Sequence, residues 1–359
     1  MKVVLIGIGQ AGGKVTEALA EFDYDMGFGA VQGAFAVNTA KSDLQSLDLD
    51  TMVIGQDRVK GHGVGGDNEL GAEIMQDEAT EVMDQLDGRV ATDAEAVVLV
   101  AGLGGGTGSG GAPALAAELE RVYDLPIYTV GILPGRDEGS IYQANAGRSL
   151  KTVIRESTAT ILIDNDAWRE SGESVEEGFD AINDQIAQRL GLLFASGENV
   201  EGVGETVVDS SEIINTLRGG GIASLGYASA EASEDAGENV NTITSLTRSA
   251  LLTGMSLPNA VEAEAALLVI AGEPSRISRK GVERARKWVE EETGSLQVRG
   301  GDFPLATDRL AALVLLGGVE RSTRVEEFME RAREAQAASP EDGEDPREAF
   351  DNENLEGLF

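Results

Sequence analysis

The sequence lacks cysteine altogether and contains a single histidine, His62, among its 359 residues. Without cysteine, the chain has no disulfide bond, no thiolate metal site and no thiol nucleophile. One histidine cannot form a cluster of imidazole ligands, and it lies in a glycine-rich loop, which favours a loop residue over a catalytic base. We therefore predict no metal site built from protein ligands and no histidine-based catalytic triad.

Long apolar runs are also missing. No stretch approaches the roughly 18 apolar residues that a membrane-spanning helix needs. The apolar N-terminal stretch is short and is interrupted at Gly7 and Gly9, unlike the core of a signal peptide. We therefore predict a cytoplasmic protein without direct membrane insertion.

Basic residues are scarce: 28 Lys and Arg face 63 Asp and Glu, which gives a formal net charge of −35 and a sequence pI of about 4.2. Such a chain has no basic surface for coating nucleic acid or anionic lipid, so both are excluded as default partners. Hydrophobic residues still make up 42% of the chain, which excludes a disordered protein despite the charge.

The acidic residues are spread over the whole chain. Ser339–Phe359 holds eight acids and one base, a net charge of −7, which leaves −28 on residues 1–338. At multimolar salt the Debye length is about 3 Å or less, so this self-repulsion is screened. The composition is therefore typical of a halophilic archaeal protein, with an ordinary acidic protein as the alternative. Residues 339–359 are predicted to form a disordered tail that is either a contact for cytoskeletal or envelope partners or a merely frayed end.

The first half of the chain alternates short apolar runs with helix-length segments. This spacing predicts an α/β fold with a doubly wound, mostly parallel sheet, the architecture in which nucleotide-binding sites lie at the carboxyl ends of the strands. The predicted strands are Val3–Ile6, Ala34–Val37, Met52–Ile54, Ala96–Ala101, Ile127–Leu133 and Thr160–Ile163, and the predicted helices are Gly12–Phe22, Asn68–Leu86, Ala112–Tyr123 and Gly139–Glu156.

A long central helix and a smaller α+β domain are predicted to follow. The helix covers about Ser174–Ala195, with Val175, Phe179, Ile182, Ile186 and Leu190 on one apolar stripe. We expect the doubly wound domain over 1–173, the connecting helix over 174–200, the smaller α+β domain over 201–338 and the tail over 339–359. In the second half, the predicted strands are Ile222–Ala228, Ala265–Ile270, Leu296–Arg299 and Ala311–Leu316, and the predicted helices are Glu231–Leu252 and Ser278–Glu292.

Three glycine-rich loops follow predicted strands. Gly7–Gly12 matches the dinucleotide fingerprint G-x-G-x-x-G, which alone would allow a nicotinamide-dependent oxidoreductase, although Asn38 replaces the acid expected after the second strand. The second loop, Gly102–Gly111, has seven glycines in ten residues and lets backbone amides surround a phosphate. It is no Walker P-loop, because no lysine lies in it. The third, Gly61–Asn68, suits either a γ-phosphate contact or a turn in which Asp67 caps a helix.

The loop Gly104–Gly110 resembles the signature loop of the tubulin/FtsZ superfamily, and the other loops fall where that family has them. Together with the acid-rich composition, residues 1–320 are most similar to the CetZ group of archaeal tubulin-like proteins. The resemblance implies a self-assembling GTPase that forms head-to-tail filaments, uses GTP and GDP with Mg²⁺ held mainly by the phosphates, and serves cell shape. The phosphate-side residues it implies are Gly9, Gln10, Ala11, Gly12, Gly13, Lys14, Asn38, Gly65, Gly66, Asp67, Asn68, Gly104, Gly105, Gly106, Thr107 and Gly108.

On the nucleoside side, the resemblance implies that Asn165 binds the guanine or ribose, Glu138 the ribose, and Asn183 the edge of the base. Phe179 is expected to stack on the base, and the alternative for this residue is core packing. Bacterial relatives carry an arginine near the phosphates where this chain has Tyr142.

The attacking water has no good base in these loops. By resemblance, Asp209 and Glu212 reach the nucleotide of the next subunit and complete its catalytic site. The alternative is local, because Asp209 can cap a helix that begins near Ser210, with Glu212 as its capping-box partner. A scaffold that binds GTP without hydrolysing it is the third hypothesis, beside the GTPase and the oxidoreductase.

Overall fold

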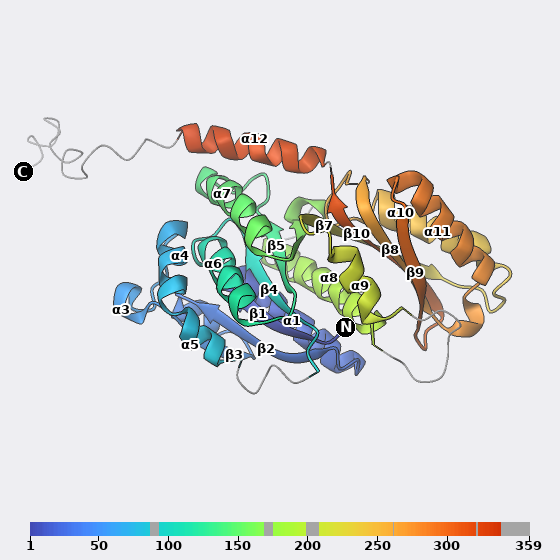
Figure 1. Ribbon diagram of the computed structural model, residues 1–359, viewed down its shortest axis with the longest axis horizontal. Coiled ribbons are helices and arrows are strands. Elements are labelled where there is room, and N and C mark those ends of the chain that lie inside the picture. Colours follow the sequence, from blue (N-terminus) through green and yellow to red (C-terminus); the bar gives the residue numbers. More distant parts are fainter. Residues whose placement is uncertain (87–92, 169–174, 199–207, 261, 321, 339–359) are drawn as a thin grey trace, which may run out of the picture.

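The computed structural model describes residues 1–86, 93–168, 175–198, 208–260, 262–320 and 322–338. Its centre is a ten-stranded sheet in the order β3-β2-β1-β4-β5-β6-β7-β10-β8-β9, with helices on both faces (Figure 1). The first six strands form one parallel array, and the last four form a second, mixed array. The predicted tail, 339–359, lies outside the described residues.

The parallel half confirms the doubly wound sheet. Its strands are β1 Val3–Ile8, β2 Val31–Asn38, β3 Asp50–Val53, β4 Ala96–Gly102, β5 Ile127–Leu133 and β6 Ala159–Asp164. All residues of β1, β5 and β6 are buried, as expected for strands covered on both faces. Because the strands are parallel, their carboxyl ends meet at one edge of the sheet, and that edge carries the glycine-rich loops.

Two layers of helices cover this half. One face is covered by α1 (Gly9–Met26) and the central helix α8 (Val175–Ser196). The other face is covered by α4 (Asn68–Asp77), α5 (Ala79–Asp84), α6 (Thr107–Val122) and α7 (Ser140–Glu156). Short helices α2 (Lys41–Leu44), α3 (Gln56–Val59) and the 3-10 turn η1 (Asn165–Ala167) lie in the connections.

The second half is antiparallel where the first is parallel. Strand β10 (Arg309–Val319) lies between β7 (Ile222–Glu231) and β8 (Ala263–Gly272), antiparallel to both, and β9 (Gln297–Pro304) runs parallel to β8. Helices α10 (Asn239–Leu252) and α11 (Arg279–Thr293) cover one face, and α9 (Ser210–Leu217) lies on the other, with the 3-10 turn η2 at Pro274–Arg276. A short parallel pairing of Thr160 with Ile222 joins the two halves of the sheet.

A chain of this length could form two domains with separate cores, but the two halves share one. One cluster belongs to the parallel half and one to the antiparallel half, but the largest runs through both, from Val3 and Ile161 to Leu267 and Leu313. Ile182, Ile186 and Leu190 on α8 enter this shared core, as their stripe predicts.

Some predicted boundaries are wrong. Asn68–Leu86 is two helices, because the chain turns at Glu78. The predicted helix Glu231–Leu252 begins only at Asn239, since β7 extends to Glu231, which pairs with Arg309 of β10, and a turn over 232–238 follows it.

Helix α12 (Thr323–Ala338) lay unrecognised in the sequence and packs along α7 (Figure 1). None of the helices in the described part of the chain is both long and apolar enough to cross a membrane.

Candidate functional site

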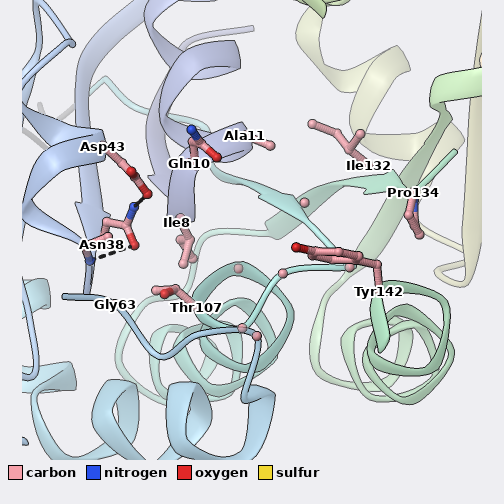
Figure 2. Close-up of a pocket in the computed structure, with 18 of the residues that line it drawn as sticks. Ile8, Gln10, Ala11, Asn38, Asp43, Gly63, Thr107, Ile132, Pro134 and Tyr142 are labelled. Carbon is pink, nitrogen blue, oxygen red and sulfur yellow. Dashed lines mark hydrogen bonds between the residues drawn. The ribbon is translucent and has the colours of Figure 1, made fainter. Parts of the chain in front are cut away.

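A cavity of about 700 Å³ lies at the carboxyl ends of the parallel strands. Residues from the ends of β1, β2, β4 and β5 and from the connections that follow them form its wall (Figure 2). Residues of α8 complete it. This is the edge at which open α/β sheets bind ligands. Sixteen predicted residues line it: Gly9, Gln10, Ala11, Lys14, Asn38, Gly65, Gly66, Gly104, Gly105, Gly106, Thr107, Gly108, Glu138, Asn165, Phe179 and Asn183.

The first loop divides its residues between the cavity and the core. Gly9 begins α1 with a positive φ of 75°, and a Cβ there would lie 3.0 Å from the amide nitrogen of Gly108. Gln10 and Ala11 are exposed toward the cavity, while Gly12 and Gly13 are buried and do not line it. A Cβ on Gly12 would lie 2.1 Å from the carbonyl oxygen of Val100, so this residue lets α1 approach β4.

The signature loop is held from several sides. Asn145, buried on α7, donates from Nδ2 to the carbonyl oxygens of Gly66 at 2.7 Å and Gly104 at 3.1 Å. The Thr107 hydroxyl lies 2.7 Å from that of Thr39, which follows β2. Gly105 lines the cavity with open space where a Cβ would lie. The loop is therefore a rigid cradle whose inner wall is backbone, suited to an anion held by amide groups.

The third loop contributes Gly65 and Gly66 to the wall, together with His62, Gly63 and Val64. Asp67 does not line the cavity: its carboxylate accepts a hydrogen bond from the Leu70 amide at 2.9 Å and caps α4. Asn68 is the first residue of that helix and also lies behind the wall. For Asp67, the structure therefore supports the capping interpretation.

An acid lies beside Asn38 at the end of β2, where the dinucleotide fingerprint expects a carboxylate and the sequence has asparagine. Asn38 Nδ2 donates to Asp43 Oδ2 at 3.0 Å, and Asn38 Oδ1 accepts from the amide of Ala40 at 3.2 Å (Figure 2). Both Asn38 and Asp43 line the cavity. The carboxylate expected after the second strand thus comes from five residues further along the chain.

The far side of the cavity is built by α8 and by the connections that follow β5 and β6. Phe179 is 37% exposed and faces the cavity, so its core-packing alternative is wrong, although Ile182, Ile186 and Leu190 on the same stripe are buried. Asn183, one helical turn later, and Asn165 also line the wall. Glu138 lines it as well, and its Oε1 accepts the amide of Gly135 at 2.7 Å.

Tyr142 lies beside the signature loop at the start of α7. It is 42% exposed, lines the cavity, and faces it together with Pro134 (Figure 2). Among the described lining residues, Lys14 alone carries a permanent positive charge, and its Nζ lies 3.9 Å from Asp180 Oδ1. A bound polyphosphate would therefore be held chiefly by backbone amides rather than by cationic side chains.

Asp209 and Glu212 lie away from this cavity, at the opposite edge of the sheet. Asp209 caps α9 by accepting the amide of Glu212 at 3.2 Å, as the local alternative predicts. The next residue, Ser210, donates to Glu95, which directly precedes β4 and also accepts the amide of Lys2. In Figure 1 the N-terminus accordingly lies beside α9. The two carboxylates are separated from the cavity by the length of β1, roughly 20 Å for six residues.

Glu212 is the perturbed acid of this edge. Partial burial raises its pKa first, and the neighbouring charge of Asp209 raises it further, against smaller opposing effects from the Asp209 backbone and Arg299. Asp209 is exposed, whereas Glu212 is half-buried. The described residues contain no group of three or more histidine, cysteine, aspartate or glutamate side chains placed to hold a metal ion.

Sequence reasoning missed several residues of the site. Asn145 and Asp43 belong to no recognisable motif. Asn145 reaches the glycine loops from α7, far along the chain, and Asp43 reaches Asn38 from five residues beyond the end of β2. Ile132 and Leu133 were predicted as strand residues, yet their carboxyl-end position also brings them into the wall.

Known proteins share both halves of this architecture. The family model described as the Tubulin/FtsZ family, GTPase domain, matches residues 2–173, and that described as Tubulin-like CetZ, C-terminal domain, matches residues 172–334. The fold is thus that of the tubulin/FtsZ class of proteins. Within that class, the chain belongs to the CetZ family of tubulin-like proteins, as its loops predicted.

Individual relatives agree with this assignment. Tubulin-like protein CetZ2 of Haloferax volcanii is 67% identical over 360 residues, covering 100% of both chains, and tubulin-like protein CetZ of Pyrococcus abyssi is 30% identical, covering 93% of this chain and 90% of that one. The similarity to a Haloferax protein agrees with the salt adaptation predicted from composition.

Solved structures of the family are equally close. One described as CetZ2 from Haloferax volcanii, a GTPgS-bound protofilament, has a TM-score of 0.91 at 67% identity, covering 94% of this chain and 99% of that one. CetZ1 from the same organism, described as a GDP-bound monomer, has a TM-score of 0.87 at 50% identity, covering 94% and 100%. The comparisons do not favour the oxidoreductase that the first loop alone would allow.

Proposed function

We propose that this protein binds GTP in the cavity and assembles head to tail into filaments that hydrolyse it. The cradle of Gly104–Gly108 and the third loop would hold the phosphates, while Phe179 would stack on the base and Asn183 would bond its edge. Asn165 and Glu138 would bind the base or ribose. The proposal is supported by a wall of backbone with room at Gly105, and by relatives described with GTPgS and GDP.

One observation carries the assembly-coupled hydrolysis: the cavity and the α9 carboxylates lie at opposite edges of one sheet. Within one subunit, Asp209 and Glu212 cannot reach a nucleotide. A second copy stacked head to tail would bring its α9 edge onto the cavity, and the relative described as a protofilament supports such stacking. A monomer would then bind GTP but lack the group that orients the water.

Glu212 is our choice for the residue that takes a proton from the attacking water. Its raised pKa makes its carboxylate a better base than an ordinary glutamate. Asp209 would hold Glu212 in place by capping α9 and would add negative charge beside it. Mg²⁺, when bound, would neutralise phosphate charge, and it would be held mainly by the phosphates and by water.

A complementation experiment tests the shared site. Glu212→Gln subunits keep the cavity and should bind GTP but release phosphate slowly, with longer-lived filaments. Gly105→Ala subunits keep Glu212 but should bind GTP at least tenfold more weakly, so they are tested at GTP concentrations that leave their cavities mostly empty. Mixing the two inactive variants should restore part of the phosphate release, because a contact in which the cavity of a Glu212→Gln subunit meets the α9 edge of a Gly105→Ala subunit joins an intact cavity to an intact Glu212.

Glu290→Gln, an exposed acid on α11, is the matched control and should behave as wild type. Absence of recovery in mixtures that co-sediment would overturn the shared site. Loss of GTP binding by Glu212→Gln monomers would do the same. Filaments of wild type with GTP but negligible phosphate release would identify the non-hydrolysing scaffold instead.

The proposed biological role follows from filament assembly. We infer a cytoplasmic filament that controls cell shape, with the acidic tail as a contact for other cytoskeletal or envelope proteins. A subunit with net charge −35 repels its copies in dilute buffer, so filaments should form only in molar salt. Light scattering and phosphate release across a KCl series test the assembly. Expression of Glu212→Gln in cells should change their shape without blocking division.

A further inference from the structure

A buried ion pair joins the C-terminal helix to the strand end beside the cavity. Arg324, in the first turn of α12, donates from Nε to Asp164 Oδ2 at 2.5 Å and from Nη2 to Asp164 Oδ1 at 2.7 Å. The two side chains are only 3% and 2% exposed. Asp164 is the last residue of β6, and the next residue, Asn165, lines the cavity. The two parallel bonds fix the orientation of both groups, which a single contact would not do.

A second aspartate extends this contact to the connection between β5 and α7. Asp166 Oδ2 lies 3.2 Å from Arg324 Nη2 and accepts the amide of Arg136 at 2.9 Å. The Arg136 amide belongs to the segment Pro134–Glu138, whose two ends line the cavity. That segment is closed by the bond from Gly135 to Glu138 and by Gln143, which donates to the Gly135 carbonyl oxygen at 2.7 Å. Arg324 therefore contacts, through two aspartates, both connections on this side of the wall.

The position of Arg324 is itself fixed by packing. Phe328, one turn further along α12, is fully buried against Leu103, Leu133 and Leu150. Ala332 lies against α7 so closely that a Cβ on Gly147 would be 2.4 Å from its own. Burial acts to lower the pKa of Arg324, but bonding to Asp164 and the charges of both aspartates outweigh it and raise the pKa, so the guanidinium stays charged. Helix α12 thus presents a permanent cation at a set place.

We propose that Arg324 is a positioning residue of the nucleotide cavity, which ties helix α12 to the two connections that carry Asn165 and Glu138. The inference rests on the proposed GTP site and adds to it a residue that affects nucleotide affinity from outside the cavity wall. Because these connections carry Asn165 and Glu138, the two residues proposed to bind base and ribose, Arg324 governs recognition of the nucleoside rather than of the γ-phosphate. Because the pair is buried, molar salt weakens it far less than a surface ion pair.

The test compares three variants of the full chain. Arg324→Lys keeps the charge but loses the two-pronged geometry, Arg324→Met leaves Asp164 buried without its partner, and Arg333→Met removes an exposed arginine of the same helix as a control. Because Arg324→Met is expected to unfold readily, the affinities are measured on Arg324→Lys, well below its unfolding transition.

For Arg324→Lys, affinity for GTP and for GDP should fall by the same factor, roughly tenfold, the lower end of what is lost when a residue that orients a metal ligand is replaced. The ratio of GTP to ATP affinity should fall as well. In assembled filaments, the KM for GTP should rise while the turnover at saturation stays within twofold of wild type. Arg333→Met should match wild type in every measurement.

A purely structural role would lower the unfolding temperature of Arg324→Lys and leave both affinities unchanged, which would overturn the proposal. A loss confined to GTP over GDP would also overturn it, because it would assign Arg324 to the phosphate side. If wild-type protein binds no guanine nucleotide, the proposed function fails instead. Hydrogen exchange then still reports on the inference, since the amides of residues 135–138 and 165–167 should exchange faster in Arg324→Lys than in wild type.

Discussion

The two edges of the parallel sheet differ in the groups that they present, backbone at one edge and side-chain carboxylates at the other. The edge that carries the cavity is built from backbone: glycine loops follow β1 and β4, and Asn145 holds two of the loops by their carbonyl oxygens. The opposite edge is built from side-chain carboxylates, since Glu95 bonds Lys2 and Ser210 while Asp209 caps α9. The first edge can surround an anion, and the second would repel one.

This difference suggests why the site needs two subunits. The signature loop positions phosphates with backbone amides and supplies no base, and a carboxylate among those amides would oppose phosphate binding. The acids that line the cavity, Asp43 and Glu138, lie outside this loop. Keeping Asp209 and Glu212 at the far edge leaves each monomer able to bind nucleotide, and stacking then brings base and substrate together. The comparison also predicts different responses to mutation: the backbone edge should not tolerate one methyl group, whereas the side-chain edge should tolerate isosteric changes and lose only charge.

The largest effect is expected from Gly110→Ala, behind the signature loop. A Cβ on Gly110 would lie 2.0 Å from the carbonyl oxygen of Asn68 and 2.6 Å from the amide nitrogen of Ala72, both backbone atoms of α4. Helices α4 and α6 would have to separate, at a cost of about 3 kcal/mol or more. Urea unfolding at fixed KCl measures the loss, and an unchanged midpoint would contradict the close approach of the two helices.

Gly105→Ala, five residues earlier in the same loop, should give the next effect and a different one. No atom lies within 4 Å of its Cβ position and its φ is not positive, so stability should change by less than about 1 kcal/mol. The methyl group would occupy the cavity side of the cradle and should weaken GTP binding at least tenfold, or about 1.4 kcal/mol. Calorimetric titration of the monomer measures this, and unchanged affinity would remove the signature loop from the binding wall.

Gly110 and Gly105 also show which part of the site could be predicted from the sequence and which could not. A run of seven glycines in ten residues predicted the cradle, because no other composition lets the backbone line a cavity so closely. It could not tell Gly110, which serves helix packing, from Gly105, which faces open space. Likewise Asp67 was predicted at the wall yet caps α4, because both roles require the same residue at the same turn.

Contacts between distant segments left no pattern at all. Asn145 bonds Gly66 across 79 residues, and Arg324 reaches Asp164 across 160. The pairing of β6 with β7, which joins the halves into one sheet, involves two residue pairs and is equally silent in the sequence. Local periodicity predicts elements, but only the folded chain decides which of them meet.

A smaller effect is expected at the carboxylate edge, from Asp209. Asp209→Ala should cost about 1 kcal/mol, because the amide of Glu212 loses its acceptor at the start of α9. Asp209→Asn should retain nearly all of that stability, since asparagine caps helices as well as aspartate does. Thermal unfolding of both variants provides the comparison, and an equal loss in the two would mean that the charge of Asp209, and not its capping bond, stabilises the helix.

The smallest effect is a pH dependence at Glu212. A glutamate ionises near pH 4.3 in the unfolded chain, and partial burial raises its pKa in the folded protein. At pH values below the unfolded value both states are protonated and the group imposes no penalty. As the pH rises between the two values, the unfolded chain loses its proton first, so the folded state loses stability. Glu212→Gln, which cannot ionise and can still complete the capping box, should therefore be more favourable relative to wild type at pH 7 than at pH 4.

Salt distinguishes the two causes of the raised pKa of Glu212, burial and the charge of Asp209. Molar KCl screens the charge of Asp209 but does not restore water to a half-buried carboxylate. The difference in unfolding free energy between Glu212→Gln and wild type should thus shrink but persist at high salt. A difference that vanishes in molar KCl would assign the raised pKa to Asp209 alone. The base proposed for hydrolysis would then have an ordinary pKa under the very conditions in which the filaments should form.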